Sequence, residues 1–429
     1  MEKFRQTVKK IIPKKVFKLL QPYYHYSLAW WGSVKYKHPS RQIMVIGVTG
    51  TKGKSSVTEL VTHILRADNK KVASLSTIQF SIGDETERNL FKMTMPGRFF
   101  VQKFLREAVD AGCEYAVVEM TSEGAKQYRH HFIEIDALVF TNLTPEHIES
   151  HGSFENYKAA KLSIAKAVEN SKKRPRYIVA NTDDEHGQDF LKFTVENKLG
   201  YSLSDLTLHS LHKDSISLVM ENTTIRVPIV GLFNVYNTLA AITLTQALGV
   251  SIKTIQEGLR DLPPIKGRVE HFSSPAGSTK PVTVVVDYAH TPDSLTKLYE
   301  AFPDKQKVCV LGNTGGGRDT WKRPEMGAIA EKYCDAIILT NEDPYDESPE
   351  KIVNDMIKGM SDEAPVKIIM DRKEAIEEAI RITPAGGYVL VSGKGTDPYI
   401  MGPNGSKIPW SDAEVVRSIL EKQEISSET

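Results

Sequence analysis

The feature that most constrains this chain is a glycine-rich turn placed between an expected strand and an expected helix. Residues 47–56 read GVTGTKGKSS, after a β-branched run at 43–48 and before helical periodicity at 57–66. Glycines let backbone N–H groups approach phosphate oxygens, and the N-terminus of a helix favours an anion. The pattern predicts a phosphate-binding loop in which Lys54 contacts the β- and γ-phosphates of a nucleotide and Ser55 binds Mg²⁺.

The match to the usual loop pattern G-x-x-x-x-G-K-[ST] is incomplete, because Val48 stands where the first glycine is expected. The alternative is a tight glycine turn that binds no nucleotide. The coincidence of strand, loop, lysine, hydroxyl and helix favours the nucleotide. The residues expected around it are Gly50, Thr51, Lys52, Gly53, Lys54, Ser55 and Ser56.

Strand and helix patterns alternate along the rest of the chain in two blocks. In the first block we expect strands at 115–119, 137–140 and 177–180, an antiparallel pair within 205–229, and helices at 233–248 and 251–262. In the second we expect strands at 282–287, 307–311, 336–340, 366–370 and 387–392, and helices at 294–302, 324–333, 349–360, 372–382 and 411–422. Such alternation is typical of doubly wound α/β domains. The predicted organisation is an arm at 1–41, a first domain at 42–265 and a second at 266–429.

Composition excludes several classes of protein. No apolar run reaches the roughly 18–20 residues that a membrane-spanning helix needs, and the charged N-terminus lacks the apolar core of a signal peptide. The cysteines at 113, 309 and 334 are odd in number and scattered, which argues against a disulfide framework and a paired-cysteine zinc site. These observations predict a cytoplasmic protein.

Charge is distributed unevenly along the chain. Residues 1–41 hold ten basic side chains and one acidic one, whereas the remainder holds 45 basic and 53 acidic groups, a composition that argues against nucleic-acid binding. The arm also contains eight of the 35 aromatic residues, among them Trp30 and Trp31. This mixture is typical of a segment in peripheral contact with an anionic membrane. The alternative is a short helix and linker whose aromatics pack on the next domain.

Short motifs follow the loop in a fixed order. They are VEMTS at 118–122, TNLTPEH at 141–147, HG at 151–152, YKAAK at 157–161, FNVYN at 233–237, GRVE at 267–270, DYAHTP at 287–292, GGGRDTWKR at 315–323 and GKG at 393–395. Together with residues 49–56, this ordered set resembles the Mur ligase superfamily, most of all the members that add the third amino acid of a peptidoglycan stem peptide. The resemblance implies a P-loop-containing central ATPase domain and a Rossmann-like C-terminal ligase domain.

The resemblance also implies ATP and two Mg²⁺ ions as cofactors. It assigns metal ligands to Ser55, Glu119, His147 and Lys161, the last as a carbamylated lysine whose cation becomes a carboxylate-like ligand. Glu119 and His147 each follow an expected strand and offer an oxygen and an imidazole nitrogen. Taken without the family, His147 is open to a structural role and Lys161 to that of a solvated helix lysine.

The reaction implied is phosphorylation of a substrate carboxylate by ATP, followed by attack of an amino group on the acyl phosphate to give an amide, ADP and phosphate. Catalysis would rest on positioning and on neutralising the phosphoryl charge. Arg268 would reach the γ-phosphate. The expected catalytic residues are Lys54, His147, Lys161 and Arg268, and the further nucleotide contacts are Asn234, Asn237 and Asp287.

Substrate residues are implied in two groups. The acceptor group is Thr94, Ser122, Gln127 and Arg129, and the amino-acid group is His290, Asp343, Tyr345, Gly393 and Asp397. Where relatives specific for diaminopimelate read D-N-P-R, residues 342–345 read EDPY, so the arginine for the distal carboxylate is missing. We predict that the added amino acid is not meso-diaminopimelate.

The relatives carry a folded domain that holds the UDP end of their substrate, whereas about 41 residues precede the loop strand here. We therefore expect a small-molecule or lipid-linked peptide acceptor, and a monomer. A folylpolyglutamate synthetase-like enzyme and a poly-γ-glutamate-type ligase remain open as alternatives. A scaffold subunit that binds ATP without ligation is the alternative that is not an enzyme.

Overall fold

The computed structural model describes residues 14–146, 148–303, 306–317 and 319–427, with residues 14–20 and 423–427 described by their backbone alone. The chain forms two compact units, one of Met1–Asp205 with Asn237–Gly258 and the other of Leu206–Tyr236 with Leu259–Thr429. Each unit contains a largely parallel sheet with helices on it, so the predicted α/β class is confirmed. The domain bounds at 42–265 and 266–429 stay a prediction.

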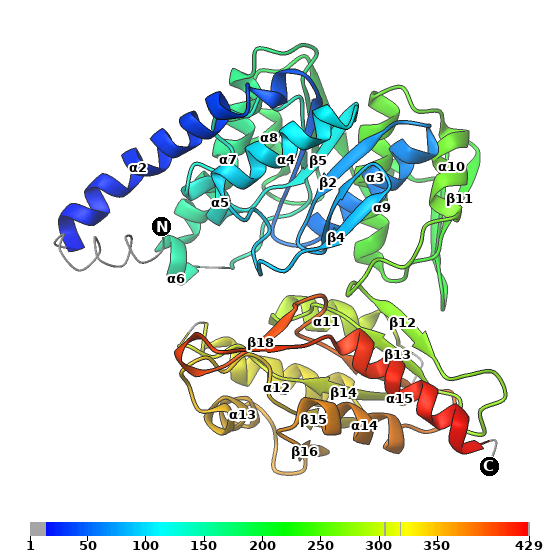
Figure 1. The fold of residues 1–429 in the computed structure, drawn as a ribbon. Coiled ribbons are helices and arrows are strands. Elements are labelled where there is room, and N and C mark those ends of the chain that lie inside the picture. Colours follow the sequence, from blue (N-terminus) through cyan, green and yellow to red (C-terminus); the bar gives the residue numbers. More distant parts are fainter. Residues whose placement is uncertain (1–13, 147, 304–305, 318, 428–429) are drawn as a thin grey trace. The chain divides into compact units, whose positions relative to one another are not determined.

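The first unit is built on an eight-stranded sheet in the order β4-β3-β2-β5-β1-β6-β7-β8 (Figure 1). From β2 across to β8 all neighbours are parallel, and β3 and β4 extend one edge antiparallel. The carboxyl ends of the parallel strands share one edge, where ligands bind in open α/β sheets. The strands are β1 (Met44–Thr49), β2 (Val72–Leu75), β3 (Gln79–Ile82), β4 (Glu85–Arg88), β5 (Tyr115–Glu119), β6 (Ala137–Phe140), β7 (Tyr177–Asn181) and β8 (Asn197–Tyr201).

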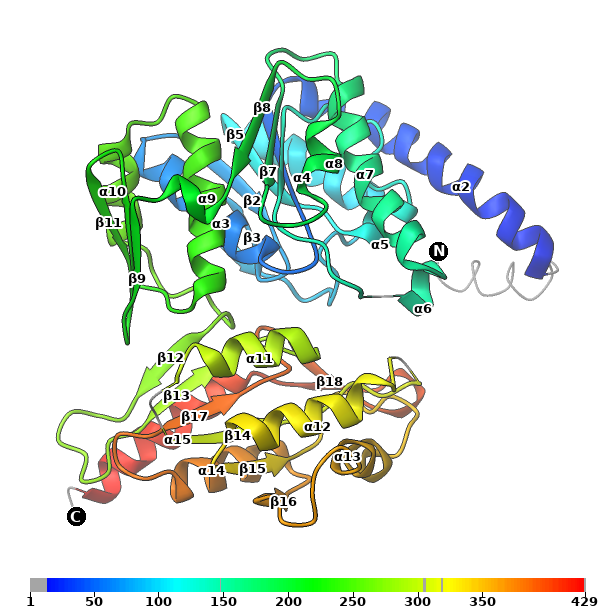
Figure 2. The ribbon, with the colours of Figure 1, turned by 180° about the vertical axis from the view of Figure 1, so that it is seen from behind.

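Helices cover both faces of this sheet (Figures 1 and 2). On one face α4, α7 and α8 share a core with alternate strand residues such as Val45, Ala116 and Leu138. On the other face α3 contacts β1, β2 and β5. The helices are α2 (Lys14–Lys35), α3 (Lys54–Ala67), α4 (Arg98–Asp110), α5 (Ser122–Lys126), α6 (Ile148–His151), α7 (Phe154–Asn170), α8 (Gly187–Leu191) and α10 (Ile252–Arg260), with α9 (Leu232–Ala247) shared between the units and a 3₁₀ turn at Pro39–Arg41.

The second unit contains a six-stranded sheet in the order β12-β13-β17-β14-β15-β16, parallel except for β12. One of its cores includes Leu295, Met326 and Met356 from α11, α12 and α13, and the other includes Ile376 and Val416 from α14 and α15. The sheet is therefore covered on both faces. The strands are β12 (Glu270–Ser273), β13 (Thr283–Val286), β14 (Lys307–Leu311), β15 (Ala336–Leu339), β16 (Val366–Ile368) and β17 (Tyr388–Val391). The helices are α11 (Pro292–Glu300), α12 (Lys322–Tyr333), α13 (Pro349–Ile357), α14 (Arg372–Ile382) and α15 (Asp412–Ser427).

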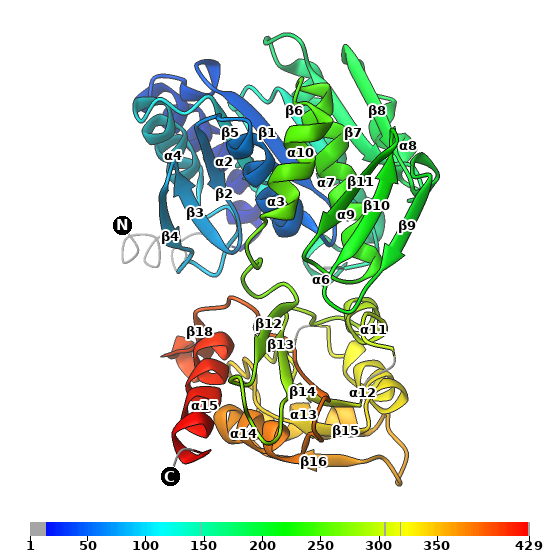
Figure 3. The ribbon, with the colours of Figure 1, turned by 90° about the vertical axis from the view of Figure 1, so that its right-hand side faces the viewer.

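Smaller sheets complete the second unit. The strands β9 (Leu208–Leu211), β10 (Ile216–Met220) and β11 (Thr223–Val227) form an antiparallel sheet of three strands (Figure 3). We had expected two strands here. Two chain reversals make three strands: residues 221–222, with left-handed backbone conformations, join β10 to β11, and the His212 N–H donates to the Ser215 carbonyl at 2.8 Å between β9 and β10. A hairpin of β18 (Tyr399–Met401) and β19 (Lys407–Pro409) follows, and 3₁₀ turns lie at Leu203–Asp205 and Pro403–Gly405.

The structure corrects the expectation that the cysteines form no disulfide. Cys309 in β14 and Cys334 are joined, with Cα atoms 6.1 Å apart, and Cys113 is free. The crossover through α12 brings β15 beside β14, so that Cys309 lies opposite Ile337. Cys334, 25 positions after Cys309 and just before β15, is thereby brought next to Cys309. Among the helices that the structure describes, none is long and apolar enough to cross a bilayer.

Candidate active site

The predicted phosphate loop lies at the carboxyl end of β1 and leads into α3. Gly50 and Gly53 both have positive φ angles, of 147° and 80°, and Gly53 is the N-cap residue of α3. A Cβ atom on Gly53 would lie 2.3 Å from Oδ1 of Asn237, and one on Gly50 would lie 1.9 Å from Oγ1 of Thr141. Both positions therefore require glycine, which also leaves the N–H groups at the start of α3 without a cap from that residue.

The segment after β6 holds the loop in place. The carbonyl of Asn142 accepts from the Thr51 N–H at 2.8 Å, and its Oδ1 accepts from the Lys52 N–H at 2.9 Å. The Thr141 hydroxyl donates to the Lys52 carbonyl at 2.6 Å. Three contacts from one short segment fix the backbone of the loop before any ligand binds.

The lysines of the loop have different partners. Lys54 donates through Nζ to the carbonyls of Gly50 and Thr51, at 3.1 and 2.8 Å, so its ammonium lies over the loop. Lys52 forms an ion pair with Glu146, with Nζ 2.9 Å from Oε1. Two cations beside a helix N-terminus make this edge of the sheet suited to a polyphosphate.

Ser55 and Glu119 meet in the interior at the end of the loop. The Ser55 hydroxyl donates to Oε2 of Glu119 at 3.0 Å, and both side chains are buried. Thr77 donates to the same carboxylate from its N–H at 2.8 Å and from its hydroxyl at 3.1 Å. Thr94 lies beside them, with its hydroxyl 2.7 Å from that of Thr77. Sequence reasoning missed Thr77, which follows β2.

Lys161 enters this cluster from α7, a helix that starts at the cap formed by Ser153. Its side chain is only 1% exposed, and Nζ donates to the Gly50 carbonyl at 2.6 Å. The amine lies 4.8 Å from the ring centroid of Tyr157, whose hydroxyl contacts that of Thr51 at 2.9 Å. Burial, together with the nearby Lys54 ammonium, holds the pKa of the Lys161 amine well below its ordinary value. Lys161 is therefore not a solvated helix lysine.

The oxygens of Ser55 and Glu119 fit a magnesium ion that would take its other ligands from phosphate and water. Apart from residue 147 and the other undescribed positions, no three His, Cys, Asp or Glu side chains gather as a metal centre. Mg²⁺ commonly takes one or two protein oxygens and fills its remaining positions with water and phosphate. Ser55 and Glu119 supply such a pair, with the carboxylate already oriented by Thr77. His147, an expected ligand, lies outside the described residues.

The expected acceptor residues form two local groups in the first unit. Arg129 donates to Oε1 of Gln127 at 2.9 Å and also to the Met95 carbonyl. Ser122, at the start of α5, contacts Nε2 of His151 at 3.1 Å.

In the second unit, Arg268 and Asp287 lie close together. The Asp287 carboxylate accepts from the N–H groups of Val269 and Ala289, at 2.8 and 2.7 Å. Burial raises the pKa of Asp287, although the Arg268 guanidinium opposes that effect. The guanidinium lies 4.6 Å from the ring centroid of Tyr288.

Two further predicted site residues of the second unit, His290 and Asn234, form hydrogen bonds with backbone carbonyls. His290 bonds through Nδ1 to the Tyr288 carbonyl at 2.7 Å. Asn234, on α9, donates to the Val230 carbonyl at 2.8 Å.

Two of the residues expected to contact the amino acid, Asp343 and Asp397, lie beside Lys394. The Lys394 Nζ lies 2.8 Å from Oδ1 of Asp343 and 3.6 Å from Oδ2 of Asp397. Tyr345 has a left-handed backbone, with φ of 52°, and its N–H donates to the Met401 carbonyl at 3.1 Å. The side chain of Lys394, which sequence reasoning quoted only as part of a motif, is fully buried.

Glu342 is a further buried acid beside this group. Its Oε1 accepts from the Thr314 hydroxyl at 3.0 Å, and burial raises its pKa. A Cβ atom on Gly393, where φ is 105°, would lie 2.1 Å from Oε2 of Glu342. Gly393 is therefore required for the carboxylate to lie where it does.

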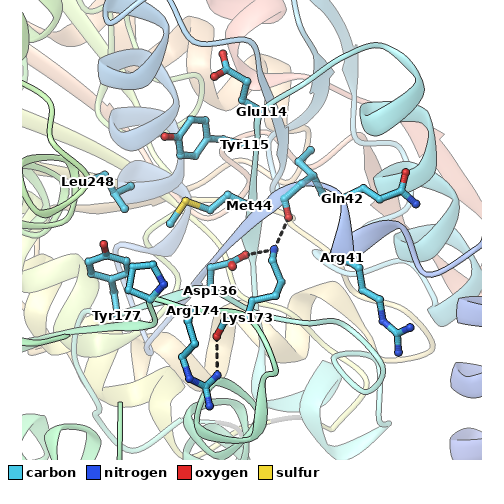
Figure 4. A pocket seen from close by; sticks show the side chains of 12 residues that line it. Arg41, Gln42, Met44, Glu114, Tyr115, Asp136, Lys173, Arg174, Tyr177 and Leu248 are labelled. Atoms are coloured by element: carbon cyan, nitrogen blue, oxygen red, sulfur yellow. Dashed lines mark hydrogen bonds and ion pairs between the residues drawn. The ribbon is translucent and has the colours of Figure 1, made fainter. Parts of the chain in front are cut away.

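A separate hollow of about 430 Å³ lies at the amino ends of β1, β5, β6 and β7, away from the loop (Figure 4). It is lined in part by Met44, Tyr115 and Tyr177. Lys173 in its wall donates to the carbonyls of Ser40 and Ile43 and to Asp136. None of the predicted site residues lines this hollow.

Comparisons with known proteins match both units. Residues 48–245 match the Mur ligase middle domain, and residues 267–395 match the domain described as "Mur ligase, glutamate ligase domain". The chain is 33% identical over 402 residues to a UDP-N-acetylmuramoyl-L-alanyl-D-glutamate–2,6-diaminopimelate ligase of Geobacillus kaustophilus, covering 90% of this chain and 81% of that one.

Solved structures give the same result. A structure of a UDP-N-acetylmuramoyl-L-alanyl-D-glutamate–2,6-diaminopimelate ligase has a TM-score of 0.60 and 28% identity, over 89% of this chain and 79% of that one. The ADP complex of folylpolyglutamate synthase from Mycobacterium tuberculosis has a TM-score of 0.65 at 17% identity, over 85% and 91% of the two chains, which shows a shared fold alone.

Proposed function

The chain belongs to the Mur ligase family, and from that premise we propose that it is an ATP-dependent, ADP-forming ligase that joins an amino acid to the carboxylate of a peptidoglycan-type peptide. The observation that carries the proposal is the convergence of the glycine loop, Lys54, the Ser55–Glu119 pair and buried Lys161 at one edge of the sheet. This edge offers phosphate donors and metal ligands together.

The reaction needs no nucleophilic side chain of the protein. An oxygen of the acceptor carboxylate attacks the γ-phosphorus of ATP, and ADP leaves with the electrons of the broken P–O bond. The amino group then attacks the acyl carbon, and the tetrahedral species expels phosphate to leave the amide, while the proton lost by the amine nitrogen passes to the phosphate or to solvent. In this scheme the N–H groups at the start of α3 and the Lys54 ammonium bind the phosphates, and the protein acts by positioning and by charge neutralisation.

Ser55, Glu119 and His147 are the residues we propose for Mg²⁺. Bound there, Mg²⁺ would neutralise charge on the transferring phosphoryl oxygens. We propose carbamylated Lys161 as the ligand of a second ion. Its low pKa supports this, because only an unprotonated amine reacts with carbon dioxide. Carbamylation would leave one N–H on Nζ, which can still donate to the Gly50 carbonyl, and would create an anion near Lys54.

The remaining nucleotide contacts are also proposals. Asn237 lies on the side of α9 that faces the phosphate loop, since its Oδ1 is the nearest atom to the position of a Cβ on Gly53. Asn234 is proposed with it for adenine, and Asp287 for the ribose or adenine side. Arg268 is proposed for the γ-phosphate, where its permanent charge would oppose that of the transferring group.

We propose that the amino acid added is not meso-diaminopimelate, although the relatives named above are diaminopimelate ligases. Tyr345 stands where an arginine would pair with the distal carboxylate, and a phenol cannot replace a bidentate guanidinium. Asp343, whose Oδ1 lies 2.8 Å from the Lys394 Nζ, is a further residue that we propose for the amino acid. His290, Gly393 and Asp397 complete the proposed amino-acid residues.

For the acceptor we propose Thr94, Ser122, Gln127 and Arg129 as contacts, with Arg129 as the cation for a peptide carboxylate. Thr94 links this group to the metal side through Thr77. The acceptor class that we propose is a small-molecule or lipid-linked peptide. We further propose that the protein works in the cytoplasm as a monomer.

A screen of ADP release tests the proposal. The full chain with ATP and Mg²⁺ is combined with cell-wall peptide precursors or folates and with each of twenty amino acids or diaminopimelate, and products are weighed by mass spectrometry. We expect ADP release only when a cell-wall acceptor and an amino acid are both present, and none from Lys54→Ala. Amide formation on folates would instead establish a folylpolyglutamate-type enzyme, and ATP binding without any product would establish a scaffold.

A further inference from the structure

Helix α2 has two faces of different character. His25, Ala29, Gly32 and Ser33 are buried, and they lie on the side that packs on α4. A Cβ atom on Gly32 would lie 3.6 Å from the Gln102 side chain, so this contact is close. Figures 1 and 2 show the N-terminal half of α2 extending away from the rest of the first unit.

Outside the buried stripe, α2 displays large aromatic side chains to solvent, and one of them, Trp31, also lies with its ring centroid 5.3 Å from that of Phe99 in α4. Four of them are at least half exposed: Tyr23 (73%), Tyr24 (52%), Trp30 (52%) and Trp31 (56%). Soluble surfaces rarely carry so many aromatics over three helical turns unless something covers them. Tryptophan and tyrosine, with an apolar ring and a polar group, are the residues that favour the boundary between water and lipid.

The charge of this segment has one sign. Helix α2 contains Lys14, Lys15, Lys18 and Lys35 and no acidic residue, and residues 1–41 together have ten basic groups and one acidic group. The remaining chain has an excess of acidic groups, 53 against 45. An anionic surface would therefore attract the segment and repel the body, which gives the protein one preferred orientation.

We propose that α2 docks the protein on a bilayer surface that contains anionic phospholipid, with Tyr23, Trp30 and Trp31 in the headgroup region and the net positive charge of the segment attracted by the lipid. The exposed rings and the single-sign charge point to the same partner. A second copy docked by the same face would place two basic segments against each other, which like charges oppose.

Helix α2 is also joined to the loop that holds the proposed acceptor residues. The Tyr26 ring lies 6.2 Å from that of Tyr128 and 5.0 Å from that of Phe132 (centroid distances). The Ser33 hydroxyl donates to the Phe132 carbonyl at 3.4 Å. Gln127 and Arg129 belong to the same short loop, so docking would bring them to the membrane surface. That last consequence rests on the proposed function, whereas the docking does not.

Vesicle flotation of the full chain without ATP or substrates tests the docking. We expect binding to vesicles of phosphatidylcholine with phosphatidylglycerol, little binding to phosphatidylcholine alone, and loss of binding at high salt. The double variant Tyr23→Ser, Trp30→Ser is expected to bind at least about tenfold more weakly. Lys14, Lys15 and Lys18→Gln is expected to lower the affinity roughly 100-fold. Trp321→Ser, which removes a tryptophan that is 59% exposed in the other unit, is the matched control.

The proposal is overturned if the wild type stays unbound with anionic vesicles, or if the α2 variants float as well as the Trp321→Ser control. It is also overturned if sedimentation shows a dimer that the Tyr23→Ser, Trp30→Ser variant dissociates, because a second copy then covers the face. Circular dichroism and ADP release in free solution, measured on the same variants, separate loss of docking from loss of folding or of the ligase reaction.

Discussion

Lys161 is the residue whose environment departs furthest from what its type leads one to expect. Lys161 is 1% exposed and donates to a loop carbonyl, and its burial, together with the nearby Lys54 ammonium, lowers the pKa of its amine. The sequence left a solvated helix lysine open, and burial removes that alternative. Its carbamylation remains a proposal that a variant can test.

Lys161→Ala is expected to abolish ligation, a loss of at least about 100-fold in kcat, because one anionic ligand near the phosphates disappears. Added short carboxylic acids, such as acetate or propionate, are expected to restore part of the rate by occupying the space. Steady-state ADP release measures both effects. Lys166→Ala, an exposed lysine on the same helix, is the control. Wild-type activity in Lys161→Ala contradicts the second metal site.

Tyr345 is the residue on which the proposed difference in amino-acid substrate between this protein and the diaminopimelate ligases depends. Without an arginine for its distal carboxylate, diaminopimelate is expected to show a kcat/KM roughly 10- to 100-fold below that of the best amino acid. The amino-acid panel measures this ratio directly. Diaminopimelate as the best substrate would overturn the interpretation of residues 342–345.

His130 gives a pH dependence whose sign follows from its burial. It is 2% exposed, and burial lowers its pKa to about 3, against 6.5 in the unfolded chain. Between those values the unfolded state binds the extra proton, so stability falls as the pH drops below 6.5, by about 2 kcal/mol at pH 5. Denaturant titrations of wild type and His130→Phe measure this. An equally steep pH dependence in the variant would show that another group is responsible.

At the scale of the element, the strand, turn and helix of the phosphate loop could be predicted because three signals coincide there. Residues 115–119 and 137–140 were predicted to the residue, since each is a short apolar run rich in β-branched side chains. By contrast, β2 (VASL) has only four residues, of mixed apolar and polar type, and β4 (ETER) is exposed along its length. Neither shows the alternation of apolar and polar residues that predicts a strand. Thr77 was missed with them, because its place beside Glu119 depends on β2 pairing with β5.

The loop itself predicts a pair of contrasting glycine variants. Gly53→Ala places a Cβ 2.3 Å from Oδ1 of Asn237 at a φ of 80°, so the Asn237 side chain or the strained loop must move, and ATP affinity is expected to fall about tenfold or more. Gly112→Ala has a similar φ of 75° and nothing within 4 Å of the added atom. It is expected to lose stability through backbone strain but to keep its ATP affinity. Calorimetric titration with ATP compares the two, and equal affinities would contradict the assigned role of the loop.

Helix α2 shows a different limit of sequence reasoning. One of the two interpretations of residues 1–41 was a short helix and linker, whereas α2 has 22 residues and contains Pro22. Its buried stripe consists of His25, Ala29, Gly32 and Ser33, which are small or polar and give no amphipathic signal. Packing on α4 accounts for the C-terminal half of the helix, where these buried residues lie, and tertiary contacts of that kind are not visible in local sequence.

At the scale of the whole molecule, the order of motifs along the chain identified the family, and the matches over residues 48–245 and 267–395 agree with it. What sequence order could not give is pairing across crossovers, as between Cys309 and Cys334, or the burial of Lys394 between two acids. Such neighbours come from different strands and loops. These contacts depend on how the strands are connected and ordered in the sheet, and no local sequence pattern predicts them.

The central claim is that ATP activates the acceptor as an acyl phosphate, and isotope transfer tests it most directly. An acceptor identified in the ADP-release screen is labelled with ¹⁸O in its reacting carboxylate and is converted with ATP and the amino acid. Mass spectrometry of the released phosphate is expected to show one ¹⁸O atom per amide formed, because a carboxylate oxygen stays on phosphorus when the amine displaces phosphate. Amide formation with unlabelled phosphate, or with AMP as the nucleotide product, would contradict the account.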